Sequence, residues 1–142
     1  MIVVDTTVLV YAKGADHPLR EPCRALIAAV DDGRVHATST VEAIQEFVHV
    51  RARRRDRSDA ADLGRAYADL FAPLLQVSES DLREGLRLFE RHSALGSFDA
   101  VLAAAAMAAG AQALVSADRA FMDVPGLPYV DPATPALQRL MR

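Results

Sequence analysis

The sequence predicts an α/β fold with a mostly parallel central sheet of four or five short strands. Short apolar runs alternate along the chain with longer amphipathic segments, which is the pattern of strands connected by helices. The chain has 142 residues, of which 51% are hydrophobic and 25% are charged, as in an ordinary globular protein. This length and composition predict a single domain, residues 1–142, whose core forms without a disulfide or a structural metal.

Five apolar runs are predicted to form the strands. The first, residues 2–4, reads Ile-Val-Val and ends directly at Asp5. The others are residues 35–38, 74–77, 113–115 and 129–130, the last being a candidate edge strand. Short, continuously apolar runs of this kind are typical of strands buried in an α/β sheet.

Polar capping residues predict where the helices begin. A side-chain acceptor placed before an apolar-periodic segment satisfies the free N–H groups of the first helical turn. The predicted start signals are, in chain order, Thr6 or Thr7, Asp16-His17-Pro18, Ser39-Thr40-Val41-Glu42, Ser58-Asp59, Ser80, Ser97 and Thr134-Pro135. The helix after Ser97 covers residues 98–109, is rich in alanine and is the most apolar of the chain.

Charge and cysteine content exclude several classes of protein. Sixteen basic and nineteen acidic side chains give a net charge of −3, which excludes a uniformly basic nucleic-acid-binding surface but not a local basic patch. The one cysteine, Cys23, excludes an intramolecular disulfide and a zinc site built from several cysteines. The N-terminus lacks the basic region of an export signal, and residues 98–109 are too few to span a membrane, so we expect a cytoplasmic protein.

Three aspartates stand where a ligand-binding crevice is predicted. Asp5 and Asp118 follow the predicted strands 2–4 and 113–115, and the carboxyl ends of parallel strands line the crevice of such folds. Each of them is equally well placed to cap the short helix after it. Asp99 lies in the first turn of the most apolar helix, where its alternative role is to complement the helix dipole.

A fourth acid, Glu46, lies inside the helix that begins near residue 41. Glu42 precedes it by one turn and fits the capping-box spacing, so we assign Glu42 to structure and Glu46 to chemistry. The two glutamates share one helix face, so spacing alone leaves both assignments open.

Converging carboxylates predict a cation. Acids brought together repel one another and raise each other's pKa unless a positive ion neutralises them. The four histidines, His17, His36, His49 and His92, have no ligand spacing, and oxygen ligands alone select hard cations such as Mg²⁺ or Mn²⁺.

Four segments together resemble the PIN-domain ribonucleases, in particular the VapC toxins of VapBC toxin–antitoxin pairs. They are Val3-Val4-Asp5-Thr6-Thr7-Val8-Leu9, Glu46-Phe47, Phe98-Asp99-Ala100-Val101-Leu102-Ala103-Ala104-Ala105 and Leu114-Val115-Ser116-Ala117-Asp118-Arg119-Ala120-Phe121. No single segment is specific, but the ordered set covers nearly the whole chain. The resemblance implies a PIN-like three-layer α/β/α sandwich with an acidic pocket at the strand ends.

The resemblance also implies the site and the activity. The catalytic acids are Asp5, Glu46, Asp99 and Asp118, of which the three aspartates hold Mg²⁺ or Mn²⁺, and Thr6 and Ser116 support them by hydrogen bonds. The implied reaction is endoribonucleolytic cleavage to a 5′-phosphate and a 3′-hydroxyl. The implied partners are an RNA substrate, a cognate VapB-like antitoxin and a second copy of the chain. The family often carries one more acid where this chain has Ala120, which leaves open the number of metals and any compensation by Asp123.

One dense basic run is the candidate for gripping the substrate. It spans residues 51–57, and we consider Arg51, Arg54 and Arg55 as contacts to RNA phosphates. The alternative is a solvated group of cations at a helix C-terminus.

Two rival classes are weighed against the nuclease. A phosphoacceptor receiver domain also binds Mg²⁺ at strand ends but needs a lysine late in the chain, whereas the only lysine here is Lys13. A non-catalytic protein- or RNA-binding module on a PIN-like scaffold has no use for all four acids.

Overall fold

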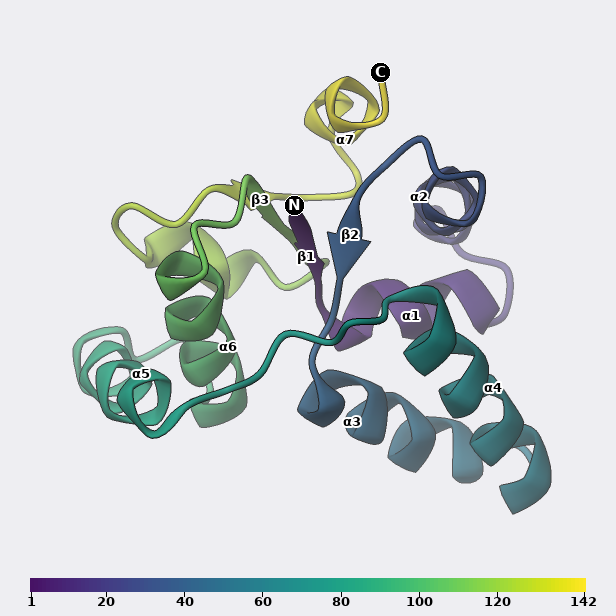
Figure 1. Ribbon diagram of the computed structural model, residues 1–142, viewed down its shortest axis with the longest axis horizontal. Coiled ribbons are helices and arrows are strands. Elements are labelled where there is room, and N and C mark those ends of the chain that lie inside the picture. The colour runs from purple at the N-terminus through teal and green to yellow at the C-terminus, as the bar shows by residue number, and fades with distance from the viewer.

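A four-stranded, all-parallel sheet forms the centre of the protein in the computed structural model, which describes residues 1–142 (Figure 1). The strands are β1 (Ile2–Val4), β2 (Ala37–Thr38), β3 (Ala113–Val115) and β4 (Tyr129–Val130), in the order β2-β1-β3-β4. Central β1 pairs in parallel with both neighbours, so Ile2 lies beside Ala37 on one side and Ala113 on the other. The predicted α/β class and parallel sheet are confirmed.

Helices cover both faces of this sheet. They are α1 (Thr6–Lys13), α2 (Arg20–Asp31), α3 (Val41–Ala52), α4 (Arg57–Leu70), α5 (Glu79–Arg91), α6 (Ser97–Ala108), α7 (Pro135–Leu140) and the 3-10 helix η1 (Arg119–Asp123). Figure 1 shows α5 and α6 on one side of the strands and α1 to α4 on the other. The result is the three-layer α/β/α sandwich that the resemblance implied. No helix combines the length and apolar character needed to cross a membrane.

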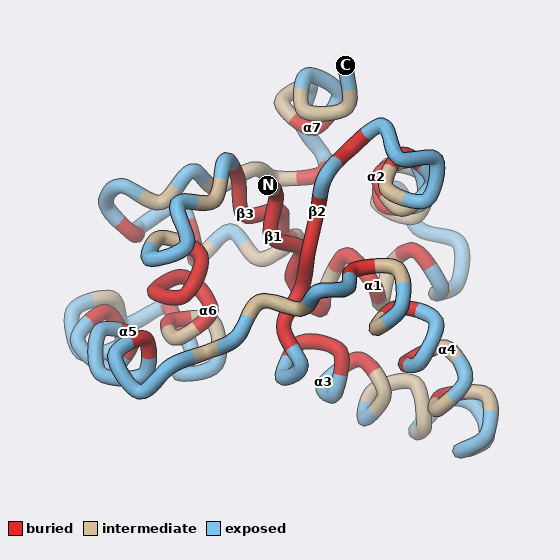
Figure 2. The backbone as a smooth tube through the Cα atoms, in the orientation of Figure 1, coloured by how far each residue is buried: buried red, intermediate tan, exposed pale blue.

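The two faces of the sheet belong to two separate cores. Ile2 and Val4 point into a core shared with α1 to α4, where Cys23 is buried and burial raises the pKa of its thiol to about 12. Val3 and Leu114 point the opposite way, into a core formed with α6, Leu88 and Phe121. Successive strand side chains alternate between faces, so covering both faces buries every residue of β1 and β3 (Figure 2).

Helices α5 and α6 pack closely because a glycine stands at their contact. A Cβ added to Gly85 would lie 2.6 Å from the Cα of Val101, a distance that no side chain tolerates. The absence of a side chain at Gly85 therefore sets how near α6 lies to its outer neighbour.

The predicted strand at residues 74–77 is wrong. This segment joins α4 to α5 and touches the sheet region through one isolated bridge, between Leu75 and Thr40. The Thr38 hydroxyl lies 3.1 Å from the Phe71 carbonyl and 3.0 Å from the Pro73 carbonyl. The Thr38 side chain therefore holds the chain just before this segment, and within the segment only Leu75 pairs with the sheet region.

Most helices begin one to three residues away from the predicted caps. The caps of α3, α4 and α5 are Thr40, Asp56 and Ser78, not Ser39, Ser58-Asp59 and Ser80. Helix α1 begins at Thr6, so Asp5 and neither threonine stands at its cap position, and the Asp5 side chain makes no capping hydrogen bond. Helix α2 follows Leu19 rather than Pro18, and Thr134 precedes α7 as predicted. Ser97 does not cap α6, because it is the first helical residue and Gly96 takes the cap position.

Candidate active site

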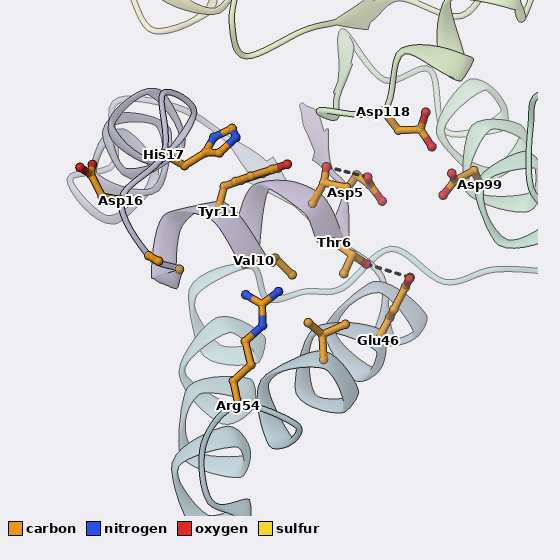
Figure 3. Close-up of a pocket in the computed structure, with 14 residues that line it drawn as sticks. Asp5, Thr6, Val10, Tyr11, Asp16, His17, Glu46, Arg54, Asp99 and Asp118 are labelled. Carbon is orange, nitrogen blue, oxygen red and sulfur yellow. Dashed lines mark hydrogen bonds between the residues drawn. The ribbon is translucent and has the colours of Figure 1, made fainter.

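A pocket of about 500 Å³ opens where β1 and β3 end (Figure 3). The four acids singled out in the sequence, Asp5, Glu46, Asp99 and Asp118, all line it. They come from the end of β1, from α3, from the first turn of α6 and from the segment after β3. The fold therefore brings together carboxylates that are up to 113 positions apart in the chain.

Asp5 is the most buried of the four acids, with 3% of its surface exposed. Its Oδ2 atom accepts hydrogen bonds from the hydroxyls of Ser116, at 2.6 Å, and Thr7, at 2.9 Å. Burial raises the pKa of the Asp5 carboxyl above its usual value, and these two hydrogen bonds oppose that rise. The two hydroxyls on Oδ2, together with the backbone N–H groups of Thr6 and Thr7, hold the carboxylate in place.

Ser116 links Asp5 to Asp118. Its hydroxyl donates to Asp5 and accepts from the backbone N–H of Asp118 at 3.0 Å, while its carbonyl accepts from the Tyr129 hydroxyl at 2.9 Å. Asp118 also caps η1, since its Oδ1 accepts from the N–H of Ala120 at 2.9 Å. Both sequence interpretations of Asp118, as a cap and as a pocket acid, therefore describe the same side chain.

Asp99 lies close enough to the other three acids for their charges to act on it. Burial, followed by the charge of Asp5, contact with the Asp118 carboxyl and the charges of Asp118 and Glu46, raises its pKa to about 8. Without a cation, Asp99 therefore holds a proton at neutral pH. The four carboxyls of the pocket are therefore not all ionised at neutral pH unless a cation is bound.

Glu46 reaches the pocket from the opposite wall. Its Oε2 atom accepts a hydrogen bond from the Thr6 hydroxyl at 3.2 Å, and that hydroxyl also lies 2.9 Å from the Ala43 carbonyl. Glu42 lies outside this pocket, and it forms no capping box because Thr40 caps α3 through the N–H of Ala43. The structural role predicted for Glu42 is therefore wrong.

The donor set fits a hard divalent cation. The pocket presents carboxylate oxygens, and burial first and the neighbouring carboxylates second raise the pKa of Asp99, so a bound cation would stabilise its charged form. No group of three or more His, Cys, Asp or Glu side chains has the geometry of a formed metal site. The fit therefore rests on donor type and charge, and not on a finished coordination shell.

The basic run divides into different roles. Arg54 lines the pocket, whereas Arg55 is exposed outside it. Arg51 is turned away from the acids, and its guanidinium binds Asp59 at 2.7 Å and the Lys13 carbonyl at 3.0 Å. The structure thus gives Arg51 a structural role in place of the predicted phosphate contact.

Sequence reasoning did not single out three residues that line the pocket, Thr7, Tyr11 and His17. Thr7 and Tyr11 are four residues apart on α1, so they share the helix face that looks onto the strand ends. Thr7 and Tyr11 lie two and six positions after Asp5 in the sequence, and this spacing could have predicted that both side chains line the pocket. His17 is brought in by the turn after α1, which no pattern in the sequence predicts.

No further carboxylate from η1 joins the four acids in the pocket. Ala120 stands where the family often has a further acid, and it supplies only its backbone N–H to Asp118. Asp123 is exposed at the end of η1 and does not line the pocket, so it does not replace the missing carboxylate.

Comparison with known proteins identifies the family of the chain. Residues 2–127 match the PIN domain family. The chain belongs to the PIN-domain family. It is 55% identical over 145 aligned positions to Ribonuclease VapC7 of Mycobacterium tuberculosis (strain ATCC 25618 / H37Rv), covering 99% of this chain and 98% of that protein. It is also 34% identical over 102 positions to Ribonuclease VapC23 of the same strain, covering 70% of this chain and 78% of that protein.

Proposed function

We propose that this protein is a metal-dependent endoribonuclease and the toxin of a type II toxin–antitoxin pair. One observation carries the activity: acids from four separate elements meet in one pocket at the strand ends. The similarity to Ribonuclease VapC7 over almost the whole length of both proteins supports RNA as the substrate. A buried carboxylate held by two hydroxyls, as at Asp5, is expected in a catalytic site and is not needed in a non-catalytic binding module.

Asp5, Asp99 and Asp118 would hold Mg²⁺ or Mn²⁺. When bound, the ion would offset the repulsion between carboxylates and phosphate, polarise the phosphodiester and acidify a water molecule. Ser116 and Thr7 orient Asp5, and the backbone N–H of Ala120 orients Asp118, so two of the ligands are held before substrate arrives.

Glu46 acts as the general base. Its carboxylate, steadied by Thr6, faces the aspartates across the pocket and accepts the proton of the attacking water. The water oxygen bonds to phosphorus as the bond from phosphorus to the 3′-oxygen breaks. The leaving oxygen takes a proton from solvent water and becomes the 3′-hydroxyl of one product, and the other product carries the 5′-phosphate. Arg54 contacts the RNA backbone from the wall of the same pocket.

The test is cleavage of a labelled single-stranded RNA pool with Mg²⁺ or Mn²⁺, and with EDTA. We expect Asp5→Asn, Glu46→Gln, Asp99→Asn and Asp118→Asn each to reduce cleavage at least 100-fold, as loss of a general base or metal ligand does. The matched control is Asp123→Asn, an exposed acid outside the pocket, which keeps the wild-type rate. Cleavage that persists in EDTA, or in Asp5→Asn with metal present, would contradict the assignment.

The proposal includes the organisation and partners of the chain. We propose that residues 1–142 form one domain, since β4 pairs with β3 and Leu137 of α7 is buried in the core around α1. We also propose a cytoplasmic location, a cognate VapB-like antitoxin and a homodimer. Large apolar side chains exposed on the chain are available for such protein contacts: Val41, Leu82, Leu86, Phe89, Phe98 and Met122. Sedimentation of the purified chain, alone and with the co-expressed antitoxin, tests both assemblies.

A further inference from the structure

The active-site pocket extends well beyond the four acids. Its second half runs along α1 to the turn before α2, where Tyr11, His17 and Arg54 line it together with Val10 and Val50. Figure 3 shows the Tyr11 hydroxyl directed toward Asp5 and the Arg54 guanidinium rising into the same space from the turn after α3. None of the chemistry assigned to the acids uses the two rings.

The two rings form a fixed pair. Tyr11 and His17 lie with their ring centroids 4.6 Å apart and their planes 33° from parallel. The Nδ1 atom of His17 accepts a hydrogen bond from the backbone N–H of Leu19 at 3.1 Å, which sets the orientation of the imidazole. A planar surface held open in a pocket is suited to a planar ligand group.

Arg54 presents a free positive charge to this half of the pocket. None of the eight ion pairs in the structure includes Arg54. Its backbone is anchored, since its N–H donates to the Arg51 carbonyl at 3.0 Å. The apolar side chains of Val10 and Val50 line the same wall, which strengthens the attraction of a cation for an anion.

The pocket therefore has four acids at one end and, at the other, a cation beside two rings, with Asp16 next to His17 as the one acid that lines this second end. A ligand that fits both ends carries repeated negative charges and planar groups, as a single RNA strand does. An acidic peptide matches Arg54 but has no regular planar group for the rings.

We propose that Tyr11, His17 and Arg54 form a nucleotide subsite beside the cleavage site, in which the ring pair stacks one base and Arg54 binds a backbone phosphate. The inference rests on the proposed ribonuclease function and deepens it, because it says how the enzyme holds the nucleotide next to the scissile bond. Stacking accepts any base and is strongest for purines, so the subsite favours a purine there without reading its edges.

The test measures binding of fluorescein-labelled A8 and U8 RNA by fluorescence anisotropy, in an Asp99→Asn background that binds without cleaving. We expect Tyr11→Leu to weaken A8 binding about 5- to 100-fold with an unchanged salt dependence, because it removes one stacked base. Tyr11→Phe retains the ring and restores the affinity. His17→Ala gives a smaller loss in the same direction.

Arg54→Met tests the proposed contact between Arg54 and a backbone phosphate. It lowers the slope of log affinity against log salt by about one, as expected for one lost phosphate contact. The matched control is Arg53→Met, an exposed arginine outside the pocket, which keeps the affinity within twofold and the slope of the background protein. Unchanged far-ultraviolet circular dichroism and Tm establish that each variant is folded.

Two outcomes overturn the subsite. One is A8 binding by Tyr11→Leu within twofold of the background protein. The other is a labelled octaglutamate peptide that binds more tightly than A8 and depends on Tyr11 and Arg54, which would assign these residues to a protein partner. RNA cleavage by the wild-type protein tests the proposed function separately. If the wild type cleaves RNA and Tyr11→Leu does not change A8 binding, the subsite alone is rejected. If the wild type does not cleave RNA, the enzymatic function is rejected, and the binding data still test the subsite.

Discussion

The charge accumulated in the acid pocket makes the metal-free protein unstable at high pH, and Asp99→Asn should remove that weakness. Folding raises the pKa of Asp99 from 3.8 to about 8 through burial and three neighbouring carboxylates. Between these two values the folded protein binds a proton that the unfolded chain has released. The stability contributed by this group is therefore complete below about pH 4 and is lost as the pH rises through 8.

The size of the effect follows from the same shift. One such proton corresponds to about 1.4 kcal/mol per pH unit, which sets an upper limit of about 6 kcal/mol over the whole range. Asp99 is partly open to the pocket and interacts with other carboxyls, so solvent screening and these interactions reduce this value. We expect about 2–3 kcal/mol between pH 5 and pH 8.

Urea denaturation in EDTA measures this difference. At pH 5 wild type and Asp99→Asn should agree within about 1 kcal/mol, and at pH 8 the variant should be more stable by about 2–3 kcal/mol. Adding Mg²⁺ at pH 8 should stabilise wild type and leave the variant unchanged. Asp123→Asn, at an exposed site outside the pocket, serves as the control. A stability difference that is the same at both pH values would refute the reasoning.

Three further substitutions test the supports of the site and the fold. Ser116→Ala should lower RNA cleavage at least tenfold and cost about 1–3 kcal/mol of stability, measured by urea denaturation, because a buried acid loses its closest hydroxyl donor. Gly85→Ala should destabilise the protein by about 1–3 kcal/mol in the same urea measurement, despite the better helix propensity of alanine, because the added methyl meets Val101. Arg51→Met should lower the Tm at pH 7, and should lower it less as the pH falls below 3.8 toward the lowered pKa of Asp59, because protonation of that carboxyl removes the ion pair. The substitution should leave RNA binding unchanged.

The strand ends were the most predictable part of the molecule. Residues 2–4 and 113–115 are continuously apolar and each run is followed closely by an acid, so the strands and the meeting of Asp5 with Asp118 follow from sequence and sheet geometry. Asp99 and Glu46 were placed by the apolar character of their helices and by the family resemblance.

Other features depend on contacts that no local pattern contains. Ser39 and Thr40 are equally good caps by residue type, but the Ser39 hydroxyl donates to the Val4 carbonyl at 2.8 Å, so Thr40 is left to cap α3. The segment at 74–77 has the composition of a strand, yet the sheet offers it a single bridge. His17 joins the pocket only because the turn after α1 folds back over Tyr11.

The three-residue strand β1 separates the two cores and also delivers Asp5 to the pocket. Inserting or deleting one residue there would exchange the side chains facing α1 and α6, and would move the acid from its hydroxyl partners. Replacing one valine of β1 by isoleucine changes neither the direction of the strand side chains nor the position of Asp5. The length of the N-terminal segment is therefore more strictly constrained than the identity of its residues. Insertions and deletions among the first five positions should be the rarest variants to survive selection for a folded, active chain.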